Sequence, residues 1–197
     1  MANISYITLN LDQIKIWKPE VETLEYCNDI FGELGYMMHD YYKTFDLDVF
    51  NRNKQLIEKT FVDTLLHQRP VPLFFHKLDK LMMLKQYWET HNKWRDPIVV
   101  TWMGQQDGMD LFYSHPGRDR VGIMNYFKVQ SYSFLNINNT DIKEHNLELI
   151  KQHWGNYQDT VFIKQSTKDS NRYVIGNLDG DSTYHKFSNL KDWLSAK

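Results

Sequence analysis

At 197 residues the chain is long enough for one domain with a buried core, and its 42% hydrophobic content excludes an intrinsically disordered protein. A net charge of −2 gives no overall positive field that would attract nucleic acid, although a local basic patch remains open. The single cysteine, Cys27, excludes an internal disulfide and a cysteine-based metal cluster. The start of the sequence lacks a secretory signal, and no apolar run reaches about 18 residues, so we expect a cytoplasmic protein outside the membrane.

The first part of the chain predicts one strand and two helices. Residues 4–17 alternate partly between apolar and polar side chains, as a half-buried strand does. Apolar side chains then recur every three or four residues over 24–41, which predicts a helix weakened by two glycines. A second helix is predicted at about 47–67, and the prolines of 69–72 end it because proline cannot continue a helix.

The central part predicts a helix followed by a hairpin. Residues 78–91 have helical spacing, and Pro97 opens a strand over 97–103. The turn signal Asp107-Gly108 leads to a second strand at 110–114, so we expect these two strands to be adjacent and antiparallel. A glycine turn then leads to a helix beginning within about two residues of Arg120.

The remainder predicts further strands and two more helices. Residues 132–137 alternate as a strand, and the capping-box pair Asp141 and Glu144 opens a helix that ends at Gly155. Short strands are predicted at 161–163, 173–175 and 184–187, with Ser188 capping a final helix. This pattern predicts a β-meander with a terminal helix over 155–197.

The turn before the central helix carries His115-Pro116-Gly117-Arg118-Asp119-Arg120. The first N–H groups of a helix have no acceptor within the helix, and its dipole adds partial positive charge there. Arginines at this end supply paired donors suited to phosphate or carboxylate. The box therefore predicts an anion site, and the alternative is a surface ion-pair cluster formed by Arg118, Asp119 and Arg120.

The order of elements around this box resembles the core of the ParB/sulfiredoxin superfamily. A helix precedes the strand Pro97-Ile98-Val99-Val100, and Gly117-Arg118-Asp119-Arg120 stands where ParB-type members have Gly-Glu-Arg-Arg. Phe134-Leu135-Asn136-Ile137 is the strand that follows the helix, and the opening strand is similar to that of the family. The resemblance implies an α/β (α+β) ParB/sulfiredoxin-like domain over 1–154, with a helical insertion at about 20–68 and the extension at 155–197.

The resemblance also implies a nucleotide site, with a nucleoside triphosphate as ligand or substrate. Gly117 would allow a close backbone approach, Arg120 would bind phosphate, and Arg118 would assist. His115 would donate to a phosphate oxygen or act as an acid or base, unless it is a hydrogen-bonded turn histidine.

Phosphoryl transfer would need a carboxylate and a divalent metal such as Mg²⁺. The candidate carboxylates are Asp119, Glu20 and Glu22. The alternative for Asp119 is a carboxylate that orients an arginine, and for Glu20 and Glu22 it is a solvated carboxylate in a first helical turn. The histidines lack the spacing of a metal site, so we predict no structural metal.

The sequence departs from the motifs of this family at two places, and each departure argues against one known activity of the family. Arg118 stands where sulfiredoxins have their reactive cysteine, and arginine cannot act as that nucleophile. Residues 147–153 lack the Glu-Asn-x-x-Arg box of the ParB clamps. Both observations argue against sulfiredoxin activity and against a ParB-type clamp.

Two hypotheses on function remain. The first is a ParB-like protein that binds nucleotide or nucleic-acid phosphate, with metal-dependent phosphotransferase or phosphohydrolase activity. The second is a non-catalytic protein that engages DNA, a nucleotide or a host protein. The His-Pro-Gly-x-x-Arg form of the box is similar to that of small phage-encoded members, which implies the host cytoplasm as the location. Turnover separates the two hypotheses.

Overall fold

The computed structural model describes residues 5–16, 23–114, 117–136, 161–165, 173–177 and 187–196. Contacts divide the chain into two units. One unit comprises 1–17, 93–121 and 128–183, and the other comprises 18–92, 122–127 and 184–197. The boundary predicted near 155 lies outside the described residues.

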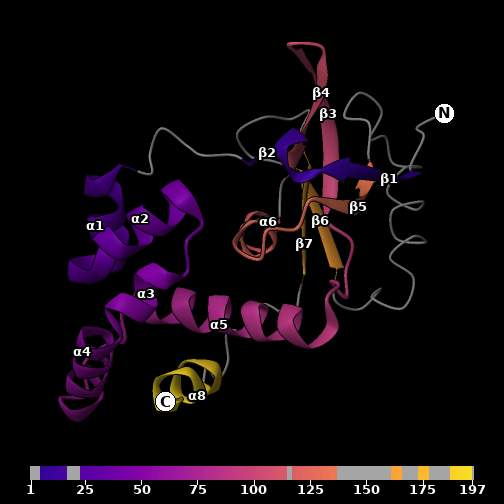
Figure 1. Ribbon diagram of the computed structural model, residues 1–197. Coiled ribbons are helices and arrows are strands. Elements are labelled where there is room, and N and C mark those ends of the chain that lie inside the picture. The colour runs from indigo at the N-terminus through magenta and orange to yellow at the C-terminus, as the bar shows by residue number, and fades with distance from the viewer. Residues whose placement is uncertain are drawn as a thin grey trace. The chain divides into compact units, whose positions relative to one another are not determined.

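The first unit contains a mixed five-stranded sheet, so the α+β class is confirmed (Figure 1). The strands lie in the order β1-β5-β3-β4-β2, and pairing is antiparallel for β3–β4 and β1–β5 but parallel for β3–β5 and β2–β4. Their bounds are β1 Ser5–Asn10, β2 Ile14–Ile16, β3 Val99–Gln106, β4 Met109–Ser114 and β5 Ser131–Asn136, with a 3₁₀ turn at Leu11–Gln13.

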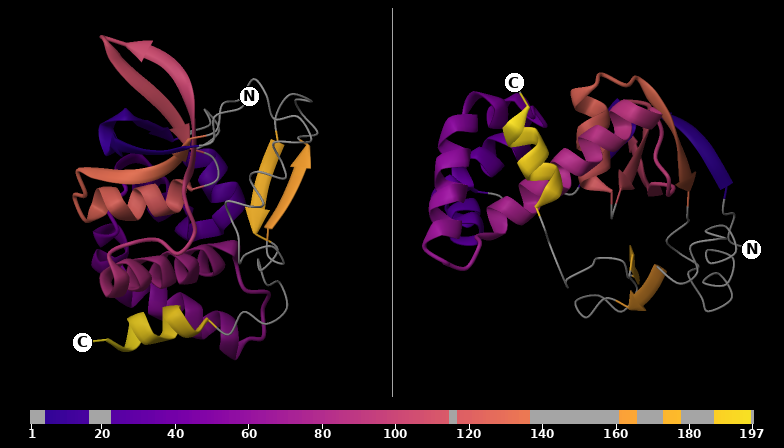
Figure 2. Two further views of the ribbon diagram at one scale, coloured as in Figure 1. Left: turned by 90° about the vertical axis from the view of Figure 1, so that its right-hand side faces the viewer. Right: turned by 90° about the horizontal axis from the view of Figure 1, so that it is seen from below.

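The predicted hairpin is confirmed. Strands β3 and β4 pair antiparallel and extend beyond their neighbours (Figure 2). The turn residues Asp107 and Gly108 have positive φ angles of 53° and 77°. Positive φ at both central residues is the hairpin-turn geometry that an Asp-Gly pair favours.

Three strands end in one row of the sheet. Val100 of β3 pairs with Ser114, the last residue of β4, and with Asn136, the last residue of β5. Ser114 also pairs with Ile16, the last residue of β2. Paired residues point to the same face of a sheet, so the Ser114, Val100 and Asn136 side chains share one face.

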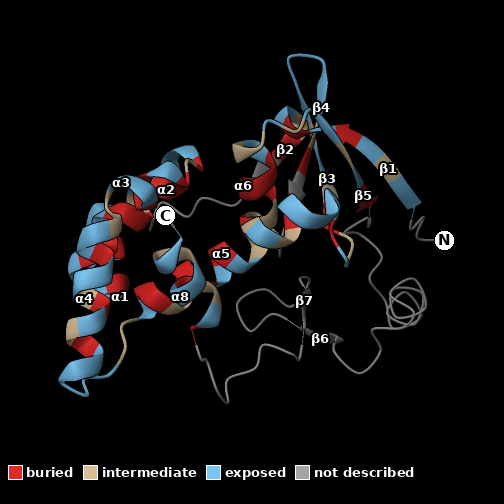
Figure 3. Ribbon diagram, turned by 60° about the horizontal axis from the view of Figure 1, so that its bottom comes forward, coloured by how far each residue is buried: buried red, intermediate tan, exposed pale blue. Residues whose placement is uncertain are grey.

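That face forms the core of the first unit. Buried residues recur along the strands (Figure 3). Tyr6 and Met103 on the other face are exposed, whereas the pair Val99 and Leu135 on that face is buried as well. The buried apolar side chains on this face are Leu9, Ile14, Ile98, Val100, Phe112 and Phe134. Ser114 is buried among them, which makes it an exception to the period-two pattern of apolar residues.

A separate two-stranded sheet confirms two of the predicted tail strands. Strand β6 spans Val161–Gln165 and pairs antiparallel with β7 at Tyr173–Asn177. The third predicted strand lies outside the described residues except for Phe187, which has a left-handed conformation directly before a helix. The helix predicted after Asp141 also lies outside them.

The second unit is helical. Its helices are α1 Leu24–Phe31, α2 Gly35–Thr44, α3 Asp48–Arg52, α4 Lys54–Leu66, α5 Leu73–His91 and α8 Ser188–Ser195, and it includes the later part of α6 Arg118–Tyr126. The predicted helix at 24–41 is two helices, because Gly32 at φ 76° interrupts it and a 3₁₀ turn follows. The helix predicted from 78 begins at Leu73, directly after Pro72. Proline has the fixed φ that suits a helix start.

Aromatic rings fill the core of the helical unit. Tyr41 lies 5.7 Å from Phe50, and Phe74 lies 6.2 Å from Phe50 and 5.4 Å from Phe75, measured between ring centroids. All four side chains are fully buried. Tilted and edge-on contacts of this kind add to the free energy gained by burying apolar surface.

Helix α8 is capped by a residue that the sequence did not indicate. The predicted cap, Ser188, is the first helical residue, and no side chain at the preceding Phe187 caps the helix. Instead the buried Asp79 carboxylate of α5 accepts the Leu190 N–H at 2.8 Å and the Asn189 Nδ2–H at 3.3 Å. A carboxylate at this end also interacts favourably with the helix dipole. Prediction of the helix was correct and prediction of its cap was wrong.

Among the described residues, no helix has both the length and the apolarity required to cross a membrane.

Candidate functional site

The predicted anion site lies where α6 begins. The Gly117 carbonyl accepts the Val121 N–H at 2.9 Å, which is the first hydrogen bond of this helix. The helix starts at Arg118, so the predicted start within two residues of Arg120 is confirmed. The backbone N–H groups of the residues before Val121 lie in the first turn, so they have no acceptor inside the helix.

Gly117 is required by close packing. A Cβ atom added to it would lie 2.8 Å from Ile98 Cγ2 and 3.0 Å from Ser114 Oγ. Real Cβ atoms essentially never approach another atom as closely as the first of these distances. The start of α6 therefore fits directly against the ends of β3 and β4, and a larger residue would displace it.

The Ser114 hydroxyl is the unusual polar group of this site. Ser114 is only 1% exposed, and its Oγ has no hydrogen-bond partner among the described residues. An unsatisfied buried hydroxyl costs about 1–3 kcal/mol, and such groups in native proteins call for an explanation. This hydroxyl lies beside Gly117, the residue directly before α6.

Asn136 supplies a second unsatisfied atom in the same row. Its Oδ1 is buried and has no hydrogen-bond partner within the described part of the chain. Ser114 and Asn136 flank Val100 on the same face, so their Cα atoms are two strand spacings apart, roughly 9–10 Å. The Ser114 and Asn136 oxygens, which have no partner among the described residues, therefore lie on either side of Val100 where β4 and β5 end.

Arg120 is bound to the chain itself. Its Nη1 donates to the Asp96 carbonyl at 2.8 Å and, at the longer distance of 3.5 Å, to the Pro97 carbonyl. Part of the side chain reaches the surface, but burial lowers the pKa of its guanidinium, and the nearby Asp96, Tyr132 and Asp119 partly offset that effect. The guanidinium thus ties α6 to the segment that leads into β3.

The other two charged residues of the box differ in burial. Arg118 is half-buried at the first position of α6. Asp119 is buried at 8% exposure, which excludes the interpretation of this carboxylate as a solvated surface group. The structure thus brings Gly117, Arg118, Asp119 and Arg120 together at one helix start.

Three predicted site residues, His115, Glu20 and Glu22, lie outside the described residues. Within the described residues, no three histidine, cysteine, aspartate or glutamate side chains are grouped to hold a metal. Asp119 alone does not form a Mg²⁺ site, because Mg²⁺ is bound by one or two carboxylates together with water and substrate phosphates. The described residues therefore do not by themselves fit a resident metal.

The sequence prediction missed Ser114 and Asn136. A signal for Ser114 was present, because Phe112 and Ser114 alternate onto the same face and a serine stands where the pattern requires an apolar residue. Asn136 follows a similar alternation after Phe134. That these atoms have no partner among the described residues depends on the tertiary structure and cannot be derived from the pattern.

Comparisons with known proteins give no match to a protein-family model, a curated protein or a solved structure.

Proposed function

We propose that the protein binds a phosphate-bearing ligand, a nucleotide or a nucleic-acid phosphate, at the start of α6. The observation that carries this proposal is the buried Ser114 hydroxyl, which has no hydrogen-bond partner among the described residues and lies beside Gly117. A phosphate oxygen accepts hydrogen bonds from hydroxyl and backbone N–H groups alike, so one ligand group satisfies both.

The local charge supports an anion. Helix α6 has nine residues, and its N-terminus carries partial positive charge from the helix dipole. Arg118 and Arg120 bring two positive charges to this helix start, and Asp119 and the nearby Asp96 bring two negative charges, so the positive potential comes from the helix N-terminus. Because the whole chain has a net charge of −2, this positive field is local, and it favours a ligand that enters the site over an extended polyanion.

The two arginines have different roles in this proposal. Arg120 acts as a positioning residue, because its guanidinium already binds the Asp96 carbonyl and holds the helix start in place. Arg118 is the arginine that meets the ligand, since it is half-buried at the first helical position. Such a division explains why two arginines two residues apart are both present.

Catalysis is a separate hypothesis within the same proposal. Phosphoryl transfer would use the box carboxylate Asp119 or a glutamate that follows β2, Glu20 or Glu22, with His115 assisting. A nucleoside triphosphate with Mg²⁺ is the substrate form to test, and the ParB/sulfiredoxin resemblance is its basis. Binding without turnover would favour the alternative of a protein that holds a nucleotide, DNA or a host protein.

The test is a thermal-shift and calorimetric panel. The ligands are pyrophosphate, the four ribonucleoside triphosphates, their deoxy forms and a short DNA duplex, each with and without Mg²⁺. A ligand that binds the native state raises the melting temperature, by an increment that grows with concentration above its Kd. We expect at least one phosphate ligand to do so, and we expect Arg118→Gln to weaken its binding by about tenfold or more.

Arg69→Gln is the matched control, because Arg69 is an exposed arginine of the helical unit that pairs with Asp63. It should leave the affinity unchanged. No shift with any phosphate ligand would refute the proposal, as would an equal loss of affinity in both arginine variants, since that result would indicate nonspecific charge attraction.

A further inference from the structure

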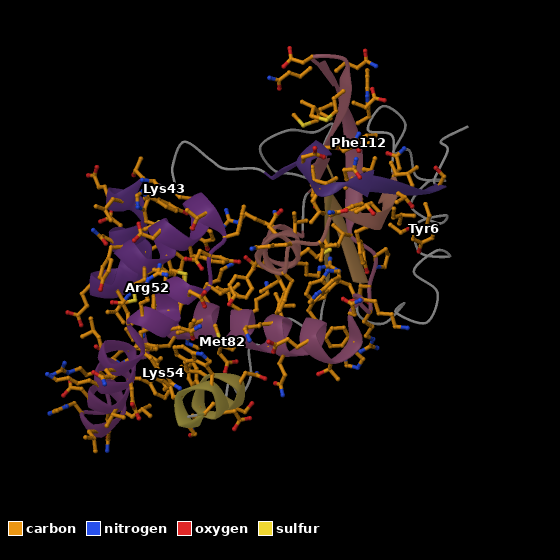
Figure 4. All side chains as sticks on the ribbon, in the orientation of Figure 1. Tyr6, Lys43, Arg52, Lys54, Met82 and Phe112 are labelled. Carbon is orange, nitrogen blue, oxygen red and sulfur yellow. The ribbon has the colours of Figure 1, made fainter. Side chains whose placement is uncertain are left out.

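The helical unit contains a groove that is independent of the α6 site. Its volume is about 250 Å³, and its lining comes from α4, α5, α8 and the segment around α3. The lining residues are Leu47, Asn51, Lys54, Met82, Lys85, Trp193 and Ala196. Figure 4 labels Lys54 on α4 and Met82 on α5, two of the residues that form its walls.

Among the described residues, the partners of Lys54 in this groove are neutral groups. Its ammonium donates to the Ala196 carbonyl at 2.5 Å and lies 5.4 Å from the centroid of the Trp193 ring. No carboxylate among the described residues lies within ion-pair distance of it, although the side chain is half-buried. A charge removed from water in this way is costly unless it is paired.

The position of Lys54 at the start of α4 is also unfavourable for a positive charge. Lys54 is the first residue of the 13-residue helix α4, whose first turn contains no acidic residue and whose N-terminus has no side-chain cap. The side chain at the cap position, Asn53, donates to the Val49 carbonyl instead. A helix N-terminus favours negative charge, so this end of α4 does not stabilise the Lys54 cation.

The remaining charges around the groove are balanced. Lys85 binds Glu89 at 2.6 Å. The Asp48 carboxylate accepts hydrogen bonds from Asn51 and Tyr126, which lower its pKa, and it also attracts Lys85 and Arg52. Among the described charged groups that line the groove, Lys54 is therefore the one without an opposite charge, and a ligand with a single negative charge would neutralise it.

Apolar surface completes the groove. Leu47 and Met82 are buried side chains whose edges line it, and the Trp193 indole is fixed by a hydrogen bond from its Nε1 to Asn51 Oδ1 at 3.1 Å. A volume of about 250 Å³ is below the usual range for drug-sized ligands. The groove thus suits a small body with a flat or branched apolar part and one charged end.

We infer that this groove is a binding site for a small organic monocarboxylate. The carboxylate would accept hydrogen bonds from Lys54 Nζ and from the first N–H groups of α4, and the apolar body would lie against Trp193 and Met82. This site does not depend on the phosphate site proposed above, since all of its residues belong to the helical unit.

Benzoate titration of the full chain tests the inference, with benzamide as the neutral isostere and inorganic phosphate as a competitor. The readouts are calorimetry and the indole N–H resonance of Trp193, assigned with Trp193→Phe. We expect saturable benzoate binding with a Kd on the order of 1 mM and a shift of that resonance. Lys54→Met should weaken binding about tenfold or more, whereas Lys54→Arg should stay within about threefold of the native chain.

Lys59→Met is the matched control, because Lys59 is an exposed lysine on the same helix, and it should leave affinity unchanged. Three results would overturn the inference: benzamide binding as tightly as benzoate, phosphate displacing benzoate at lower concentration, or Lys54→Met retaining native affinity. The first and second concern the native chain alone, so they remain decisive if the variant does not fold.

Discussion

At the scale of single residues, two arginines of one turn are placed in different environments. Arg120 donates to the backbone carbonyls that precede β3, while Arg118 begins the helix and is half-buried. The family resemblance implies that Arg120 binds phosphate and that Arg118 assists, which is the reverse of the roles proposed here. The distinction depends on the position of the Asp96 carbonyl, 24 residues earlier in the chain.

Replacing Arg120 tests its role in positioning. Arg120→Met keeps the aliphatic stem but removes the donors, so it leaves the Asp96 carbonyl without its charged partner. We expect the free energy of unfolding, measured in urea, to fall by about 2 kcal/mol, as is typical for hydrogen bonds to charged groups. Arg69→Met, at an exposed arginine, should change it by less than about 0.5 kcal/mol. Unchanged stability of Arg120→Met would show that the guanidinium does not hold the fold.

The extent of sequence prediction also differs by residue. Gly117 could be identified because a strand, a glycine and a helix in this order imply a tight approach. The role of Ser114 could not, because its missing partner is a property of every atom around it. Asp79 likewise caps a helix that begins 109 residues later, and no local pattern links two such positions.

At the scale of elements, a hydrogen bond joins the end of α6 to the start of α3. The Tyr126 hydroxyl donates to Asp48 Oδ1 at 2.9 Å. Burial and this bond raise the pKa of Tyr126 to about 12, and the bonds from Asn51 and Tyr126 lower the pKa of Asp48. Both shifts stabilise the same pair, the neutral tyrosine with the ionised carboxylate.

The pH dependence of stability follows from these directions. The folded pKa of Tyr126 lies above an unfolded value of about 10, so its contribution is complete below about pH 10 and is lost as the pH rises toward 12. Asp48 has a lowered folded pKa, so its contribution is complete above about pH 4 and is lost as the pH falls through the folded pKa.

Tyr126→Phe isolates this pair. At pH 7 we expect the variant to be about 1 kcal/mol less stable, the usual net value of one hydrogen bond. Urea titrations at several pH values should show the difference from the native chain constant up to about pH 9.5 and smaller by pH 11. A difference that stays constant across that range would mean that Tyr126 titrates normally and that the bond is absent in solution.

The boundaries of elements were predictable where chemistry decides them locally. The Asp-Gly turn fixes the β3–β4 hairpin, and Pro72 marks the start of α5. The break at Gly32 was not predicted, because glycine weakens a helix without ending it unless the chain adopts a positive φ there. Phe74 and Phe75 are neighbours in sequence and both are buried, which depends on packing within the helical unit and not on a local pattern.

At the scale of the whole molecule, each of the two units carries its own candidate site for an anion. The strand unit offers a buried hydroxyl and a helix start with two arginines, and the helical unit offers a groove with one uncompensated lysine. The net charge of −2 does not indicate either site, because negative charges elsewhere in the chain outweigh the local positive charges. Local geometry, and not overall charge, therefore identifies both.

The most direct test of the phosphate site is the Ser114→Ala variant, measured for stability and for binding. Removing an unsatisfied buried hydroxyl should leave the ligand-free melting temperature unchanged or higher, since a cost of about 1–3 kcal/mol disappears. The affinity for the phosphate ligand found in the panel should fall about tenfold by calorimetry, because one of its donors is lost. A lower ligand-free melting temperature with unchanged affinity would contradict the account, since the hydroxyl would then serve the fold and not a ligand.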